Sequence, residues 1–330
     1  MEAVMENKKV HKGNLLSLPL LKQTLKSTWV LWLVMTIGCS AIFLIINTVV
    51  FSKDIFVNID MDKVSVYVTD ENLSWLQILG LLDKMGYSLE RIQVMSRIDL
   101  NSILNELVYK IAGVLLPMIY VMISANQLLA NQVTSGSLAY VLSTPTSRKT
   151  VLRTYALFMG MSIIAMYIIV TGSALGSEAI AGIIRVSNGG SRNMIPLRTF
   201  LYCLSSMCAM LCLAGICFGA SAWFNKSNYS IAVGGGVCVI SFLGVILGLF
   251  GNKVFVSVGI GVEAMSIFNY FSIFTLIDTE SISSHIKFLY HLSDGAQSLA
   301  WLFKMIGLLV GGTIFATIGS VKFIKKDLPL

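Results

Sequence analysis

Six separated stretches of about 20 apolar residues limit what this chain can fold into more than any other feature. A helix of that length crosses the roughly 30 Å hydrocarbon core of a bilayer, because an α-helix rises about 1.5 Å per residue. Charged residues make up only 12% of the 330 residues, about half the content of a soluble domain. Alternating barrel strands are absent, so we expect an all-α integral membrane fold. The expected spans are residues 29–51, 103–124, 154–176, 200–223, 229–250 and 301–324.

A seventh apolar stretch, residues 254–277, contains Glu263 near its centre and Asn269 further along. Polar groups of this kind are costly in lipid. We therefore expect a re-entrant or interfacial pair of short helices before the last span. The alternative is a seventh true span, which would place the two chain ends on opposite sides of the membrane.

Basic residues gather at one set of span ends. Twelve Lys and Arg residues lie before the first span, between spans two and three, between spans four and five, or at the C-terminal end. Lys and Arg near span ends remain cytoplasmic, so we expect a multi-pass plasma-membrane protein with both termini in the cytoplasm. The net charge of +7 then reflects topology and gives no reason to expect nucleic-acid binding. The predicted cytoplasmic segments are 1–28, 125–153 and 325–330, and the predicted outer segments are 52–102, 177–199 and 251–300.

Two of these segments have patterns of their own. In the leader, Leu18, Leu21 and Leu25 recur at helical spacing beside Lys22 and Lys26, which predicts an amphipathic helix in the cytoplasmic interface; the alternative is a disordered leader. The outer segment 52–102 combines a strand-like run at 64–68 with an amphipathic stretch at 73–85. It is either a small subdomain or a solvated connection.

Catalytic and metal-binding motifs are missing. The sequence has no phosphate-binding loop, no zinc-protease motif and no nucleophile elbow. All six cysteines fall in expected spans, where small packing residues are the simplest interpretation; Cys208 and Cys212 as soft-metal ligands are the alternative. Lys110 and Glu178 lie near span ends, where snorkelling explains them. We expect no catalytic residue and no metal site.

Small residues and one proline mark where helices pack or bend. Gly244 with Gly248, and Gly307 with Gly311, form Gly-x-x-x-Gly pairs that allow close helix approach, within one subunit or at a dimer seam. Pro117 removes a backbone donor inside the second span and should kink it.

The segment between spans two and three is the most distinctive. Its apolar residues are too dense for a plain linker, and Pro145 ends any helix before a basic pair. A short amphipathic cytoplasmic helix followed by a turn is a docking element for a soluble partner. The apolar residues are Leu128, Leu129, Val133 and Leu138.

This segment resembles the ABC-2 type permease family, the membrane subunits of ATP-binding cassette exporters. The similarity is carried by residues 136–140 (GSLAY), 142–145 (LSTP), 147–148 (SR) and the C-terminal 323–330 (FIKKDLPL). The order of spans also matches, so the resemblance covers nearly the whole chain. Members of that family commonly have an acidic residue near the position of Gln132, and often a second one near that of Thr134. This chain departs from the family at both positions. At position 132 an amide stands in place of the charge.

The resemblance implies an exporter that works as a dimer with a second permease copy or homologue, in the lipid bilayer. A separate ATPase subunit would hold ATP and Mg, and this chain would need no cofactor and would not be an enzyme by itself. We expect an amphipathic peptide or drug as substrate. The alternatives are an ATP-independent secondary transporter or channel, and a membrane-bound enzyme or sensor. The residues expected to couple the chain to the ATPase are Gln132, Val133, Gly136, Leu138, Tyr140, Pro145 and Arg148.

Overall fold

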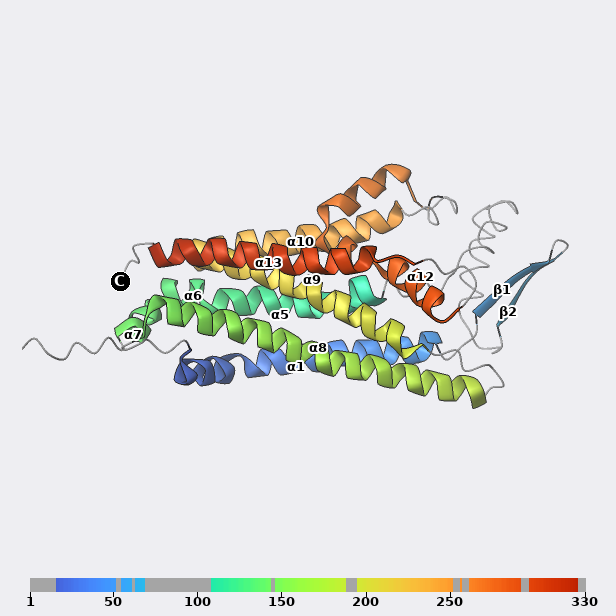
Figure 1. Cartoon of the computed structure of the whole chain (residues 1–330), viewed down its shortest axis with the longest axis horizontal. Helices are drawn as coiled ribbons and strands as arrows, with labels where there is room; N and C mark the ends of the chain where they lie inside the picture. Colours follow the sequence, from blue (N-terminus) through green and yellow to red (C-terminus); the bar gives the residue numbers. More distant parts are fainter. Residues whose placement is uncertain are drawn as a thin grey trace, which may run out of the picture.

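The computed structural model is an elongated bundle of long helices (Figure 1). It describes residues 16–51, 55–60, 63–68, 108–143, 146–187, 195–251, 256, 261–291 and 297–325. Six helices in these ranges are long and apolar enough to cross a membrane. This confirms the prediction of an all-α membrane fold with six spanning helices. They are α1 (Leu18–Phe51), η1 with α5 (Val108–Ala112 and Gly113–Leu128), α8 (Arg148–Ser187), α9 (Pro196–Trp223), α10 (Ser227–Phe250) and α13 (Ala300–Lys325).

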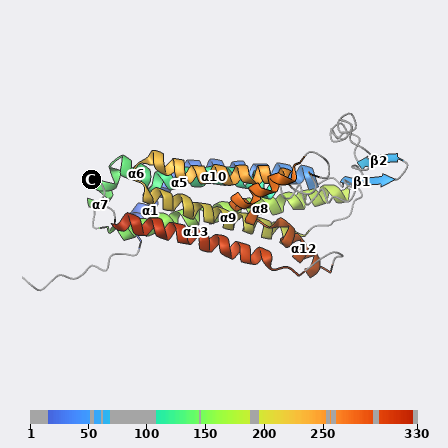
Figure 2. The same cartoon turned by 90° about the horizontal axis from the view of Figure 1, so that it is seen from above.

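Helix α9 lies at the centre of the bundle. It packs against α5, α8, α10 and α13, while α1 lies along α8 on one side. Figures 1 and 2 show α1 beside α8 and α13 beside α9 in both views. The indole N–H of Trp32 in α1 donates to the carbonyl of Ser162 in α8 (2.9 Å). The bundle core therefore forms around α9, and the outer faces of α1, α8, α10 and α13 remain apolar and exposed.

Two helices are longer than the hydropathy pattern predicted. Helix α1 begins at Leu18, so the expected leader helix and the first span form one continuous helix. Helix α8 has 40 residues, which is about 60 Å at 1.5 Å per residue, and it continues through Ser187 into the expected loop 177–199. Residues 177–184 contain no proline. Although they include Gly182 and three isoleucines, nothing in them blocks the helix hydrogen bonds, so the helix passes the end of its apolar run.

The strand-like run at 64–68 lies in a β-hairpin. Strands β1 (Ile55–Asp60) and β2 (Lys63–Val68) pair antiparallel, with Ile55 opposite Val68 and Asp60 opposite Lys63. The amphipathic stretch predicted at 73–85 lies outside the described residues.

Short helices connect α10 to α13, as the polar residues at 254–277 led us to expect. They are η2 (Glu263–Phe271), η3 (Ile273–Leu276) and α12 (Thr279–Leu289). Helix η2 runs back along α10. A Cβ atom on Gly244 would lie 3.1 Å from the carbonyl oxygen of Phe268, and one on Gly248 would overlap the side chain of Asn269. This glycine pair therefore provides space for η2.

Helices α9 and α13 approach each other closely at glycines. A Cβ atom on Gly219 would lie 2.5 Å from the carbonyl oxygen of Phe315, and one on Gly312 would lie 2.6 Å from Cys212 Cα. Gly215 and Gly319 meet backbone of the other helix in the same way. The pair 307/311, which the sequence pattern favoured, is different: among the described residues nothing lies within 4 Å of a Cβ on Gly307.

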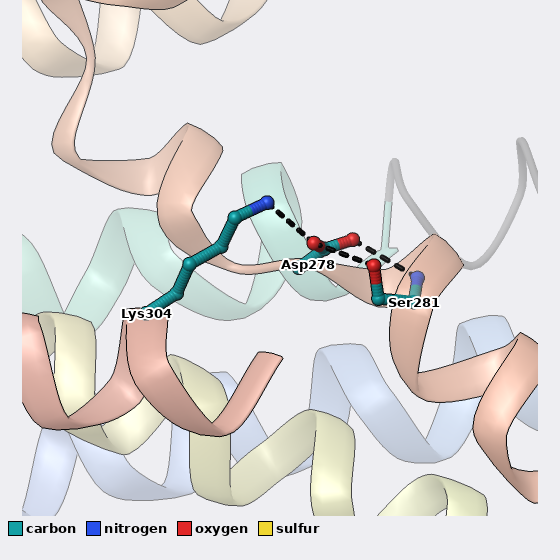
Figure 3. A network of polar contacts seen from close by, with 3 residues as sticks. All are labelled: Asp278, Ser281 and Lys304. Carbon is teal, nitrogen blue, oxygen red and sulfur yellow. Dashed lines mark hydrogen bonds and ion pairs between the residues drawn. The ribbon is translucent and has the colours of Figure 1, made fainter. Parts of the chain in front are cut away.

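A polar network fixes α12 to the start of α13 (Figure 3). The carboxylate of Asp278 caps α12 by accepting from the Ser281 backbone N–H (3.0 Å) and hydroxyl (2.8 Å), and it forms an ion pair with Lys304 of α13. Burial alone would raise the pKa of Asp278, but the hydrogen bonds from Lys304 and Ser281 outweigh it and hold the pKa below its usual value of 3.8. The charged form therefore stabilises this corner.

The α9–α13 contact predicts that Gly215→Ala destabilises the protein. The added methyl group would overlap the Gly312 backbone, and such overpacking costs about 1–3 kcal/mol. Thermal unfolding in detergent should show a lower midpoint. Gly307→Ala is the matched control, since its methyl group meets open space and alanine favours the helix. Equal midpoints for the two variants would contradict the close contact.

The Asp278 network predicts a pH-dependent loss of stability. Asp278→Asn should lower the unfolding midpoint at pH 7, where the ion pair is intact. Because the folded pKa is depressed, the stabilisation is present above the unfolded pKa of about 3.9 and disappears as the pH falls through the folded pKa. The midpoints of wild type and variant should therefore converge in acid. Glu280→Gln, which removes an exposed neighbouring charge, should show no comparable gap.

Candidate functional site

The second spanning helix ends in an elbow at one end of the bundle. We use the name elbow for residues 129–148, which include α6 (Ala130–Thr134) and α7 (Ser137–Ser143). Helix α5 ends at Leu128, and Leu129 leaves helical geometry with φ −126° and ψ −68°. The elbow, the start of α1 and the end of α13 lie at the same end of the molecule (Figure 1).

The helix break is buried, so its backbone groups need partners within the protein. The fully buried hydroxyl of Ser221 in α9 provides them. It accepts from the Ala130 N–H (3.1 Å) and donates to the Ala125 carbonyl (2.7 Å). One side chain thus takes the place of the missing helix hydrogen bond and fixes the elbow to the centre of the bundle.

Thr134 and Asn126 fix the elbow to the turn between α9 and α10. The Thr134 hydroxyl accepts from the Ser227 backbone N–H (2.9 Å), and its one proton is shared between the carbonyls of Ala130 (2.8 Å) and Asn225 (3.2 Å). The side-chain amide of Asn126 donates to the Ser227 hydroxyl (2.8 Å). These contacts join residues about a hundred positions apart in the sequence.

Gln132 connects the elbow to α8. Its side-chain oxygen accepts from the Tyr155 hydroxyl (2.8 Å). The side-chain amide of Gln132 therefore makes a contact within this chain. Tyr155 and Gln132 also line a cleft of about 470 Å³ between the first turn of α1 and the elbow, together with Pro19, Gln23 and Tyr140.

Helix α7 follows a turn that requires glycine. Gly136 has φ +71°, a conformation that strains other residues. From this turn α7 buries Leu138, which is 1% exposed, and presents Tyr140, which is 80% exposed. Val133 in α6 is buried as well. The elbow therefore has one face held by the bundle and one exposed aromatic residue on the other.

The remaining predicted residues lie at the borders of the elbow. Arg148 begins α8, where the Ser147 hydroxyl accepts from the Thr150 N–H (3.2 Å) as a helix cap. Pro145 lies outside the described residues. Pro117 is buried within α5 and has no N–H to donate to the Gly113 carbonyl one turn earlier. That carbonyl accepts instead from the Tyr167 hydroxyl (3.4 Å) and the Cys39 thiol (3.7 Å).

Sequence reasoning missed Ser221, Thr134 and Tyr155 as parts of the site. A serine in an apolar span was the available signal, because buried polar groups in membranes are normally hydrogen-bonded, but the same span also contains Ser205 and Ser206, so the signal did not single out Ser221. All six cysteines are buried. Within the described part of the chain, no group of three or more His, Cys, Asp or Glu residues is placed to hold a metal ion.

Comparison with known proteins gives one match. A family model described as ABC-2 family transporter protein matches residues 24–328. No curated protein and no solved structure matches the chain. The match covers the elbow and all six spanning helices except the first six residues of α1.

The geometry of the break predicts that Ser221→Ala weakens the elbow. The buried Ala130 N–H would lose its acceptor, which costs about 1–3 kcal/mol. We expect a lower unfolding midpoint and faster hydrogen exchange in α6. Ser205→Ala is the matched control in the same helix, because the buried Ser205 hydroxyl has no hydrogen-bond partner among the described residues. If both variants behaved like wild type, Ser221 would not hold the break.

Proposed function

The chain belongs to the ABC-2 family of transporter proteins and is a permease subunit of an ATP-binding cassette transporter; we propose that it is an exporter driven through α7 by a separate ATPase subunit. That subunit would bind ATP and Mg. The sequence has no phosphate-binding loop of its own, which agrees with this division of labour.

The proposal rests on two residues of α7, Tyr140 and Leu138, which lie on opposite faces of the helix. Helix α7 exposes 80% of Tyr140 and buries Leu138, so a partner can bind one face while the bundle holds the other. Large exposed aromatic residues are typical anchors of protein interfaces. The elbow sits at the end where the positive-inside rule places the cytoplasm, the compartment in which an ATPase would act.

The contacts of the elbow would distribute a movement of α7 over the bundle. Gln132 reaches α8, Ser221 holds the break to α9, and Thr134 reaches the start of α10. ATP binding would favour one conformation of the permease only if the ATPase contacts α7 differently in the two states. This would shift the population between inward-open and outward-open forms.

We further propose that two permease copies pair to form the pathway, in the plasma membrane with both termini cytoplasmic. The basic residues at the elbow end support this orientation. For the substrate we propose an amphipathic peptide or drug, because the spans are largely apolar and contain few charges.

Reconstitution tests the proposal. Vesicles that contain the chain and its cognate ATPase should show ATP-dependent flux of an amphipathic drug or peptide. Flux that is equal with and without ATP would favour a secondary transporter or channel and contradict the proposal.

Tyr140→Ala should reduce ATP-dependent flux and co-purification of the ATPase by about tenfold, the loss expected for one interface anchor of about 1.4 kcal/mol. Its folding should not change, because the side chain is largely exposed. Tyr270→Ala is the matched control, since Tyr270 is 90% exposed but lies on η2, away from the elbow. Equal co-purification of both variants would rule out α7 as the binding element.

A further inference from the structure

Glu178 is a buried acid in the half of α8 that lies away from the elbow. Its side chain is 9% exposed, and its carboxylate accepts from the Thr199 hydroxyl in α9 (2.7 Å). The sequence placed Glu178 near a span end, where snorkelling into water would be easy, but the structure turns it into the bundle. In the described part of the chain no basic side chain forms an ion pair with it.

Aromatic rings lie near this carboxylate. Tyr109, on the π-helix η1, has the carboxylate of Glu178 and the side chains of Thr199 and Asn47 among its electrostatic neighbours. Its ring lies 5.3 Å from Phe43 of α1 and 5.0 Å from Tyr202 of α9, measured between ring centroids. Residues of α1, η1, α8 and α9 therefore lie close together near Glu178.

Asn47 of α1 completes the group. It is 1% exposed, and neither its amide nitrogen nor its amide oxygen makes a hydrogen bond of normal geometry among the described residues, although its side chain lies near enough to the Tyr109 hydroxyl to interact with it. An unpaired buried polar group costs about 1–3 kcal/mol. A carboxylate without a counter-charge adds a further penalty in a membrane. Among the described residues, the Glu178 carboxylate thus has the Thr199 hydroxyl as a donor and no counter-charge, and Asn47 has a side-chain oxygen without a donor of normal geometry.

We propose that Glu178, Asn47, Thr199 and the rings of Phe43, Tyr109 and Tyr202 form a binding site for an organic cation. A carboxylate, an amide oxygen and a hydroxyl accept from or attract a cation, and aromatic faces attract a positive charge that has lost its water. A metal ion is a poor fit, because Glu178 belongs to no group of three His, Cys, Asp or Glu ligands among the described residues. The inference rests on the proposed function, since the cation would belong to the exported molecule.

The site is closed in this conformation and borders a place built to bend. A Cβ atom on Gly113 would lie 2.5 Å from the ring of Phe43, so the Phe43 side chain of α1 packs directly on the backbone at the start of α5. The Gly113 carbonyl, which Pro117 cannot reach as a donor, accepts from side chains of α1 and α8. Helix kinks and π-helices occur where a span can change shape. Separation of α1 or η1 from α8 and α9 would admit the ligand.

Binding to the purified chain in nanodiscs, without ATP or ATPase, tests the site. The probes are tetraphenylphosphonium and its isosteric anion, tetraphenylborate, with lipid uptake subtracted by empty discs. Wild type should bind the cation saturably, and Glu178→Gln should weaken that binding about tenfold or more while keeping the Thr199 hydrogen bond. Glu178→Asp should restore part of the affinity. The matched control is Glu263→Gln, an exposed acid on η2, which should bind like wild type.

Asn47→Leu separates a binding role from a structural one. If the amide serves only the ligand, this variant should bind the cation more weakly and unfold no earlier than wild type. Three outcomes would overturn the proposal: no saturable cation binding, equal cation and anion binding, or Glu178→Gln binding like wild type. Since no ATPase is present, loss of ATP-dependent flux with intact cation binding would contradict the proposed function alone.

Discussion

The hydroxyl of Ser221 holds the place where the second span stops being a helix. Leu129 and Ala130 are buried in the protein, so their backbone groups must find partners there, and a helix can break at such a place only if side chains replace the lost hydrogen bonds. Ser221 does this for Ala130 and Ala125 at once. The direction of α6 and α7, the exposure of Tyr140 and the contacts of Thr134 all follow from that break.

Hydropathy was enough to predict the spans, because crossing a bilayer sets a minimum apolar length and the sequence meets it six times. The elbow was also visible, since Gly136 and the dense apolar residues near it are local signals. The sequence did not show which residues contact each other across the bundle. Gly215 and Gly219 have the same spacing as Gly307 and Gly311, but only the first pair meets a helix backbone. The spacing of two glycines shows only that one face of a helix lacks bulky side chains. The arrangement of the other helices decides whether a helix packs against that face.

The same limit explains Glu178 and the ends of α1 and α8. Hydropathy averaged along the sequence locates the end of an apolar run. A helix can continue beyond that end until it reaches residues that break helices. The burial of Glu178 depends on Thr199 and Tyr109, which come from other elements, so no local pattern indicates it. Polar residues within or beside a span are therefore the positions at which sequence reasoning most needs the structure.

Helix α8 contacts the elbow and also carries the acid of the proposed cation site on one continuous helix. Tyr155 bonds to the elbow and Glu178 lies 23 positions later in the numbering, about 35 Å along the axis. Each residue advances an α-helix by about 100°, so the phase between the two side chains depends on the number of residues between them. A single inserted or deleted residue in this stretch would turn Glu178 away from Thr199 even if every other contact survived. The length of α8 should thus vary far less through evolution than its composition.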